Sequence, residues 1–253
     1  MINIVKMDIY RLFKTKALYI IGVVFVGLVI LLTYFSYELG DAEGIDTNLK
    51  IYVDYTMSFT IMVYTVVIAV FSVLFTTAES SSGYIKNIGG QISARSILIL
   101  SKAAALLLYT IVMFVIYFIV QMIANKAFFG YIEFRGEARE FTEYAAIQIL
   151  LHFALALLCM MAAVIIRKNG IAMTIAVILG LRITGNFYEG INMLFDSFDG
   201  FDISKYLLIG NMNSLLLAED ISSVAGGAII VGVCFAAVSL LVSCLFFEKR
   251  DIV

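Results

Sequence analysis

Long uninterrupted apolar stretches alternate with short polar segments along the chain. About 20 apolar residues in a helix, which rises about 1.5 Å per residue, match a bilayer hydrocarbon core about 30 Å thick. Because the bilayer core has no water to satisfy free backbone groups, stretches of this length must be helical. The pattern therefore predicts an all-α, polytopic membrane protein with six transmembrane helices, at about 17–37, 55–78, 103–125, 144–166, 170–185 and 224–247.

The fifth predicted span is short or irregular, because Gly180, Arg182, Gly185 and Asn186 arrive early in it. Only residues 167–169 separate it from the fourth span, so these two spans form a tight antiparallel hairpin. We predict that 17–253 form a single transmembrane domain.

Residues 1–16 combine basic and apolar positions at helical spacing. The basic positions are Lys6, Arg11, Lys14 and Lys16, and the apolar arc contains Ile2, Val5, Ile9, Leu12 and Phe13. Ile4 and Met7 fall on the polar side. A basic amphipathic helix binds the surface of an anionic membrane. We predict such an interfacial helix rather than a secretory signal, since the next apolar stretch is too long for a signal core and no small-residue cleavage site follows.

Composition supports the membrane class. Hydrophobic residues make up 62% of the chain and charged residues 14%, whereas soluble proteins have about half and about a quarter. Lysines and arginines concentrate on the side of the predicted bundle that holds both termini, and these residues mark the cytoplasmic face of a membrane protein. We therefore predict a plasma-membrane protein with both termini in the cytoplasm.

The sequence lacks the motifs of common membrane-associated enzymes. It contains no G-x-x-x-x-G-K-[ST] phosphate-binding loop and no H-E-x-x-H zinc motif. A single histidine cannot build a multi-histidine metal site, and Cys159, Cys234 and Cys244 lie within apolar stretches, where they behave as small hydrophobic residues. We expect no enzyme, no bound metal or cofactor and no nucleic-acid partner, so any ATP is used by a partner chain.

Two ionisable side chains within predicted spans are candidates for cargo contact. His152 lies in the fourth span and Arg182 in the fifth. Ionisable groups in hydrocarbon are costly and are often functional. The structural alternatives are a neutral His152 imidazole bonded to a neighbouring helix, and an Arg182 side chain that reaches the outer headgroups or pairs with Glu189.

Segment 79–102, between the second and third predicted spans, is longer than a plain turn requires. Gly83 and Gly90 bracket a short stretch within it, and Ser93 is a suitable N-cap for the following helix. A short helix in this stretch would present a mixed apolar and polar surface to a groove on a soluble partner. The residues of that surface are Tyr84, Ile85, Lys86, Asn87 and Ile88. The alternative is a plain cytoplasmic turn.

The same segment carries a family resemblance. Its pattern is Glu79-x-x-x-Gly83-x-x-Lys86-Asn87, followed by Ser93-x-Arg95 and Ser101-Lys102. With the basic N-terminal helix, the six spans and the phenylalanine-rich last span, it resembles the membrane subunits of ABC-2 type exporters, similar to bacterial permeases for antimicrobial-peptide and bacteriocin export and immunity. Gln91 and Ile92 stand where that family often has a proline, which leaves the shape of the short helix open.

The resemblance implies that the short helix is a coupling helix, which docks on a cytoplasmic ABC ATPase. The predicted coupling residues are Glu79, Gly83, Tyr84, Ile85, Lys86, Asn87, Arg95 and Lys102. ATP and Mg²⁺ would bind to two copies of the ATPase, and the chain would pair with a second copy or a related permease in the bacterial plasma membrane. The expected cargo is a hydrophobic or amphipathic molecule such as an antimicrobial or toxin-like peptide. The alternatives are an ion-coupled secondary transporter and a non-transporting scaffold or sensor.

Overall fold

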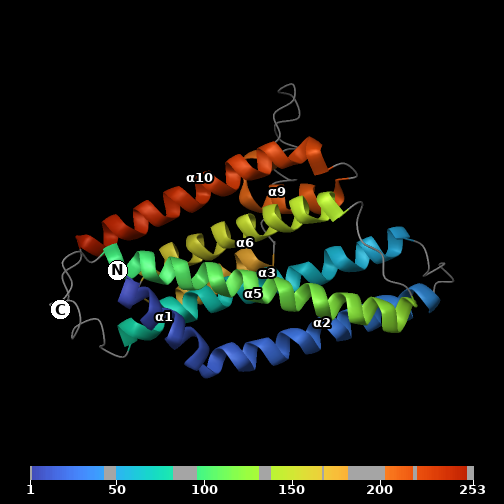
Figure 1. Cartoon of the computed structure of the whole chain (residues 1–253), viewed down its shortest axis with the longest axis horizontal. Coiled ribbons are helices and arrows are strands. Elements are labelled where there is room, and N and C mark those ends of the chain that lie inside the picture. The colour runs from blue at the N-terminus through green and yellow to red at the C-terminus, as the bar shows by residue number, and fades with distance from the viewer. Residues whose placement is uncertain are drawn as a thin grey trace.

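The computed structural model describes residues 2–42, 50–81, 96–130, 138–166, 168–181, 203–218 and 221–249, and within these ranges the fold is all helical (Figure 1). The helices in chain order are α1 (Ile2–Lys14), α2 (Lys16–Ala42), α3 (Lys50–Ser81), α5 (Ser96–Phe129), α6 (Ala138–Ile166), α7 (Asn169–Gly180), the 3₁₀ helix η1 (Ile203–Tyr206), α9 (Leu208–Leu217) and α10 (Ile221–Glu248). The long helices run along one axis of an elongated bundle. The chain is therefore a helical bundle of the kind that the apolar stretches predict.

Among the described residues, five helices are long and apolar enough to cross a membrane: α2, α3, α5, α6 and α10. They extend beyond the predicted spans; α5, for example, has 34 residues, about 51 Å of helix. α7 has 12 residues, about 18 Å, which is shorter than the hydrocarbon core. α7 covers the first part of the predicted fifth span, and a sixth crossing stays a prediction because residues 182–185 lie outside the described residues.

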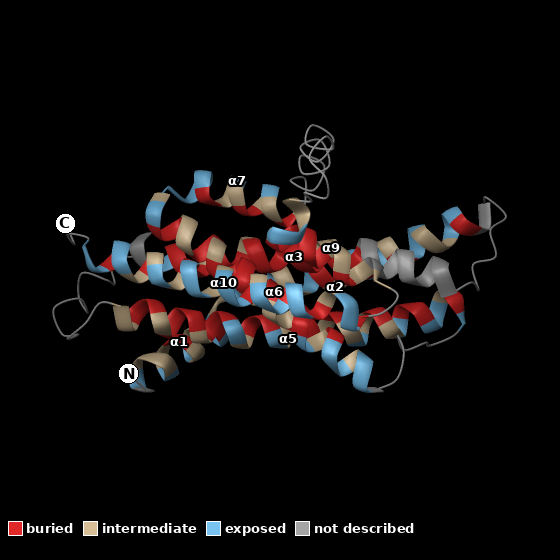
Figure 2. Ribbon diagram, turned by 90° about the horizontal axis from the view of Figure 1, so that it is seen from above, coloured by how far each residue is buried: buried red, intermediate tan, exposed pale blue. Residues whose placement is uncertain are grey.

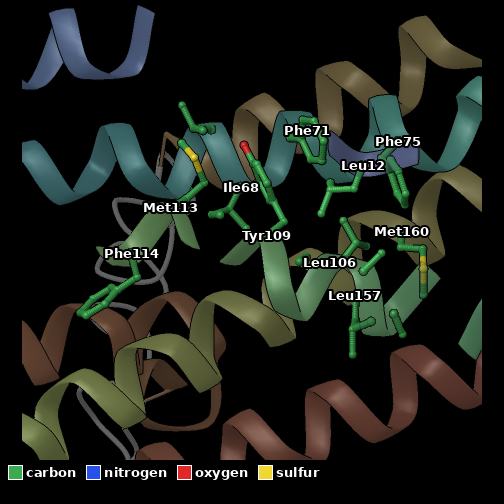
Figure 3. Close-up of a cluster of buried hydrophobic side chains, with 14 of the residues drawn as sticks. Leu12, Ile68, Phe71, Phe75, Leu106, Tyr109, Met113, Phe114, Leu157 and Met160 are labelled. Carbon is green, nitrogen blue, oxygen red and sulfur yellow. The ribbon is translucent and has the colours of Figure 1, made fainter. Parts of the chain in front are cut away.

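α3 and α6 occupy the centre of the bundle. α3 contacts α2, α5, α6 and α7, and α6 contacts α5, α7, α9 and α10 as well as α3. Buried residues accordingly concentrate along these helices, whereas α7 lies at the outside (Figure 2). One buried apolar cluster joins α1, α2, α3, α5 and α6 and includes Phe247 of α10 (Figure 3), and a second joins α3 and α6 to α7, α9 and α10.

The start of α1 and the end of α10 lie at the same end of the bundle, here called the terminal end (Figure 1). The end of α3 and the start of α5 lie there too. Segment 79–102 contains the predicted coupling residues and joins α3 to α5 at the terminal end. The sequence also predicts that this segment and both termini share one side of the membrane.

The buried face of α1 corrects the predicted apolar arc. Leu12 is buried as expected, but Phe13 is exposed and Ile4, which the pattern assigned to the polar side, packs against the core. Between Ile4 and Leu12 on the same face lies Asp8, which is only 1% exposed. The predicted arc was wrong here because it was drawn from the apolar residues alone, whereas Asp8 is buried with partners on α5 and on its own helix.

Two close approaches depend on glycine. A Cβ at Gly180 of α7 would lie 2.7 Å from the Cα of Val66, so α7 and α3 meet backbone to backbone. A Cβ at Gly210 of α9 would lie 2.0 Å from the carbonyl oxygen of Ser204 in η1. The sequence pattern did not predict η1 or α9, because the stretch around them mixes apolar residues with acids.

Candidate functional site

The structure places two of the predicted coupling residues in helices. Glu79 lies in the last turn of α3, and Lys102 lies near the start of α5. The others, namely Gly83, Tyr84, Ile85, Lys86, Asn87 and Arg95, lie outside the described residues, as does Arg182. The structure therefore shows where the predicted site is attached to the bundle, at the end of α3 and the start of α5. We call this attachment the anchor of the site.

Asp8 of α1 forms one half of this anchor. The Ser101 hydroxyl of α5 donates a hydrogen bond to the Asp8 carboxylate, and the Arg11 guanidinium Nη1 lies 3.7 Å from Asp8 Oδ1. Hydrogen bonds to an ionised carboxylate are about twice as strong as neutral ones. Asp8 thus attaches α1 to the first two turns of α5, the helix that directly follows segment 79–95.

Lys102 forms the other half. It is only 2% exposed, and its ammonium nitrogen lies 5.5 Å from the ring centroid of Phe75 in α3. An ammonium group over an aromatic face is attracted to the electrons of the ring, and lysines are seldom fully buried without a partner. Ser101 and Lys102 therefore connect the start of α5 to α1 and to α3 through adjacent residues. We call Asp8, Arg11, Phe75, Ser101 and Lys102 the terminal junction.

A second polar site lies in the middle of the bundle around His152, which is fully buried. Its Nδ1 lies 2.7 Å from the Gln148 carbonyl oxygen, and its Nε2 lies 3.1 Å from the hydroxyl of Thr65 on α3. A carbonyl only accepts, so Nδ1 carries a hydrogen in this arrangement. The ring centroid of Tyr64 lies 4.4 Å from that of His152. His152 thus has the neighbouring-helix hydrogen bond that we gave as its structural alternative.

Further polar side chains continue this site between α3 and α5. The Tyr64 hydroxyl donates to the Thr110 carbonyl at 2.9 Å, and the Thr60 and Tyr117 hydroxyls are 3.1 Å apart. We call the full set the polar seam: Thr60, Tyr64, Thr65, Thr110, Tyr117 and His152. Of these residues, only His152 stands out in the sequence as a candidate. The available signal was the occurrence of Thr and Tyr inside apolar stretches, where hydroxyl groups serve as interhelical hydrogen-bond partners.

The described residues contain no group of three or more His, Cys, Asp and Glu side chains that could hold a metal ion. Cys159 is buried, Cys244 is half-buried and Cys234 is exposed, and all are free thiols.

Together, the long apolar helices and the polar contacts between them define a polytopic helical membrane protein. The chain belongs to the DUF2705 family of proteins of unknown function, whose match covers residues 18–253. No curated protein matches the sequence.

Proposed function

We propose that the chain is the membrane permease subunit of an ATP-driven exporter of the ABC-2 type. The cargo is a hydrophobic or amphipathic molecule, with an antimicrobial or toxin-like peptide as the best fit. The sequence has no phosphate-binding loop of its own, so the energy must come from a partner ATPase. The bundle of apolar helices supports the bilayer as its surroundings.

The terminal junction is the observation that carries this proposal. α5 begins at Ser96, directly after segment 79–95, and Ser101 and Lys102 then contact α1 and α3. Because α3 leads into the same segment, a displacement of the segment pulls on α3 and α5 directly and on α1 through Asp8. A rigid junction of this kind transmits the movement of a docked partner into the membrane helices.

The proposed cycle requires the ATPase to bind the segment differently in its open and closed states, since only a differential interaction shifts a conformational equilibrium. ATP and Mg²⁺ bind to two ATPase copies, and a second copy of this chain or a related permease completes the cargo path. His152 lies in the centre of the described bundle and remains a candidate for cargo contact.

The test is co-purification of the full chain with the Walker-motif ATPase encoded next to it, followed by ATPase and export assays in vesicles. Lys86→Ala should weaken docking, and Asp8→Asn should preserve docking but reduce export, because the carboxylate that pairs with Arg11 and accepts from Ser101 becomes an amide. Lys6→Ala, an exposed position on α1, is the matched control and should leave both activities unchanged. Failure to bind any nucleotide-hydrolysing subunit would overturn the proposal.

A second candidate, a proton-coupled secondary transporter, is favoured by the bonding of His152. The Thr65 hydroxyl lies 3.1 Å from His152 Nε2 and 2.9 Å from the Ile61 carbonyl oxygen. It can donate to Nε2 of a neutral ring, or donate to Ile61 and accept from a protonated ring. Transport that stops when an uncoupler collapses the proton gradient, while ATP is kept constant, would favour this candidate over the exporter.

A further inference from the structure

A cavity of about 390 Å³ lies between α1, α2 and α5. Its lining is almost entirely apolar and includes Leu12 of α1, Leu18 and Val26 of α2, and Met113 and Ile116 of α5. Sites for small molecules range from about 300 to about 1,000 Å³ and are mostly apolar with a few placed polar groups. The cavity is thus large enough for a ligand and has the matching chemistry for a hydrocarbon chain.

The Tyr109 hydroxyl is the unusual polar group of this lining. Tyr109 is 1% exposed, and within the described residues its hydroxyl has no hydrogen-bond partner. Its ring stacks on Phe71 of α3 at a centroid distance of 3.9 Å, so packing holds the side chain in place (Figure 3). The other lining tyrosine, Tyr19, already donates to the Phe13 carbonyl at 2.8 Å. A buried hydroxyl without an acceptor is unfavourable, so Tyr109 points to a ligand that supplies one.

The polar groups lie toward one end of the cavity. Leu18 and Tyr109 line the end next to the α1–α2 turn, whereas Val26 and Ile116 lie about two helical turns, or roughly 10 Å, further along α2 and α5. The turn between the lining residues Phe13 and Leu18 contains Lys14 and Lys16, both exposed. From this end inward, the site offers positive charge, then one hydroxyl donor, then only hydrocarbon.

We propose that this cavity binds one acyl chain of an anionic phospholipid, with the phosphate headgroup at Lys14 and Lys16 and an ester carbonyl accepting a hydrogen bond from Tyr109. An anionic phospholipid has these groups in the same order: a charged headgroup, ester carbonyls and an acyl chain. The bound lipid fastens the α1–α2 turn to α5. The site does not depend on whether the protein is an exporter.

The experiment uses the purified full chain in phosphatidylcholine vesicles that contain a small fraction of phosphatidylglycerol with a photoreactive diazirine on its acyl chain. After illumination, mass spectrometry of peptides should locate the label on α2 and α5 around Val26 and Ile116. Unlabelled phosphatidylglycerol should compete better than unlabelled phosphatidylcholine. Equal competition by the two lipids, or stronger competition by a hydrophobic peptide, would overturn the proposal.

Two glycines of α2 provide a matched pair of variants. A Cβ at Gly22 or at Gly27 meets no atom within 4 Å, so either position accepts a side chain, but only Gly22 lines the cavity. Gly22→Leu should fill the cavity and reduce labelling by about tenfold or more, since overpacking of about 1.4 kcal/mol corresponds to tenfold in affinity. Gly27→Leu should label like the natural protein. Equal labelling of both variants would contradict the proposed site.

Two further variants test the polar groups. Tyr109→Phe keeps the ring and removes the hydroxyl, which should weaken lipid competition by about two- to tenfold, the usual effect of one hydrogen bond. Joint Lys14→Gln and Lys16→Gln substitution should abolish the preference for phosphatidylglycerol while retaining acyl-chain labelling. Circular dichroism and size-exclusion chromatography confirm folding of each variant. An unchanged preference in the lysine variant would show that the headgroup lies elsewhere and would overturn the anionic assignment.

Discussion

α3 and α10 are both long apolar helices, yet they have different surroundings. In the most apolar window of α3, 67% of the residues are buried within the chain, whereas the corresponding figure for α10 is 17%. α3 is enclosed by α2, α5, α6 and α7, while α10 lies against one side of the bundle and exposes Ile230 and Leu241. Mean hydropathy is high in both, so hydropathy alone does not reveal which helix faces lipid.

Both helices have buried hydroxyls that bond to carbonyls of their own helix, such as Ser72 of α3, but α3 also has polar side chains that reach other helices. α3 contributes Thr60, Tyr64 and Thr65 to contacts with α5 and α6 in the polar seam. In α10 the buried hydroxyl of Ser243 bonds to the carbonyl of Ser239 in its own helix, at 2.6 Å. Because lipid is as apolar as the protein interior, hydrophobic burial does not separate a central helix from a peripheral one, whereas close packing and hydrogen bonds between helices do.

The largest contrast is expected from truncation at His152 and at Ile230. His152→Ala removes a fully buried ring and its hydrogen bond to Thr65 of α3, and should lower the free energy of unfolding by about 3 kcal/mol. Ile230→Ala removes an exposed side chain of α10 and should cost less than about 0.5 kcal/mol. Unfolding in mixed micelles by added sodium dodecyl sulfate measures both.

A small loss for His152→Ala would show that the centre of the bundle relaxes around the missing ring. The polar seam would then be incidental to the fold, and the distinction between central and peripheral helices would rest on packing alone. Equal, large losses in both variants would instead indicate that Ile230 is covered by a second protein chain and not by lipid.

A second contrast comes from one glycine packed between two helices and one glycine with open space beside it. Gly180→Ala places a methyl group 2.7 Å from the Cα of Val66 and should cost about 2 kcal/mol by forcing α7 away from α3. Gly27→Ala on α2 meets nothing within 4 Å and should cause no loss, or a gain of up to about 1 kcal/mol from helix propensity. The same unfolding assay should thus give effects of different sign. A neutral Gly180→Ala would mean that α7 is not held tightly against α3.

The membrane class and the candidate spans could be predicted from the sequence because an apolar stretch of about 20 residues has few alternatives to a membrane helix. The face that α1 presents could not be predicted. Asp8 looks like a surface residue in a basic helix, and its partner Ser101 is distant in the sequence. Helical periodicity relates only residues that are close together in the sequence. It therefore does not predict that Asp8 is buried against Ser101, which lies 93 residues away.

The candidate site, too, could be predicted only in part from the sequence. His152 stood out because it is ionisable, whereas Tyr64 and Thr65 did not, since such side chains are also common on lipid-facing and interfacial surfaces. Only the arrangement of α3 beside α5 and α6 brings the Tyr64 hydroxyl to the Thr110 carbonyl and the Thr65 hydroxyl to the His152 ring. The resemblance-based coupling residues Gly83, Lys86 and Arg95 stay predictions, and their anchor at Lys102 is the part that the fold describes.

The smallest and most specific contrast uses one substitution in two places. Tyr64→Phe on α3 removes a buried hydroxyl that donates to the Thr110 carbonyl, and should cost about 1 kcal/mol. Tyr19→Phe on α2 removes an exposed hydroxyl bonded to the Phe13 carbonyl, where headgroups or water replace the lost bond, and should cost almost nothing. Both changes delete one oxygen from the same kind of ring, so their difference isolates the environment of the hydroxyl. Indistinguishable unfolding midpoints for the two variants would mean that hydrogen bonds in the centre of this bundle stabilise it no more than those at its edge. Close packing alone would then distinguish the central α3 from the peripheral helices.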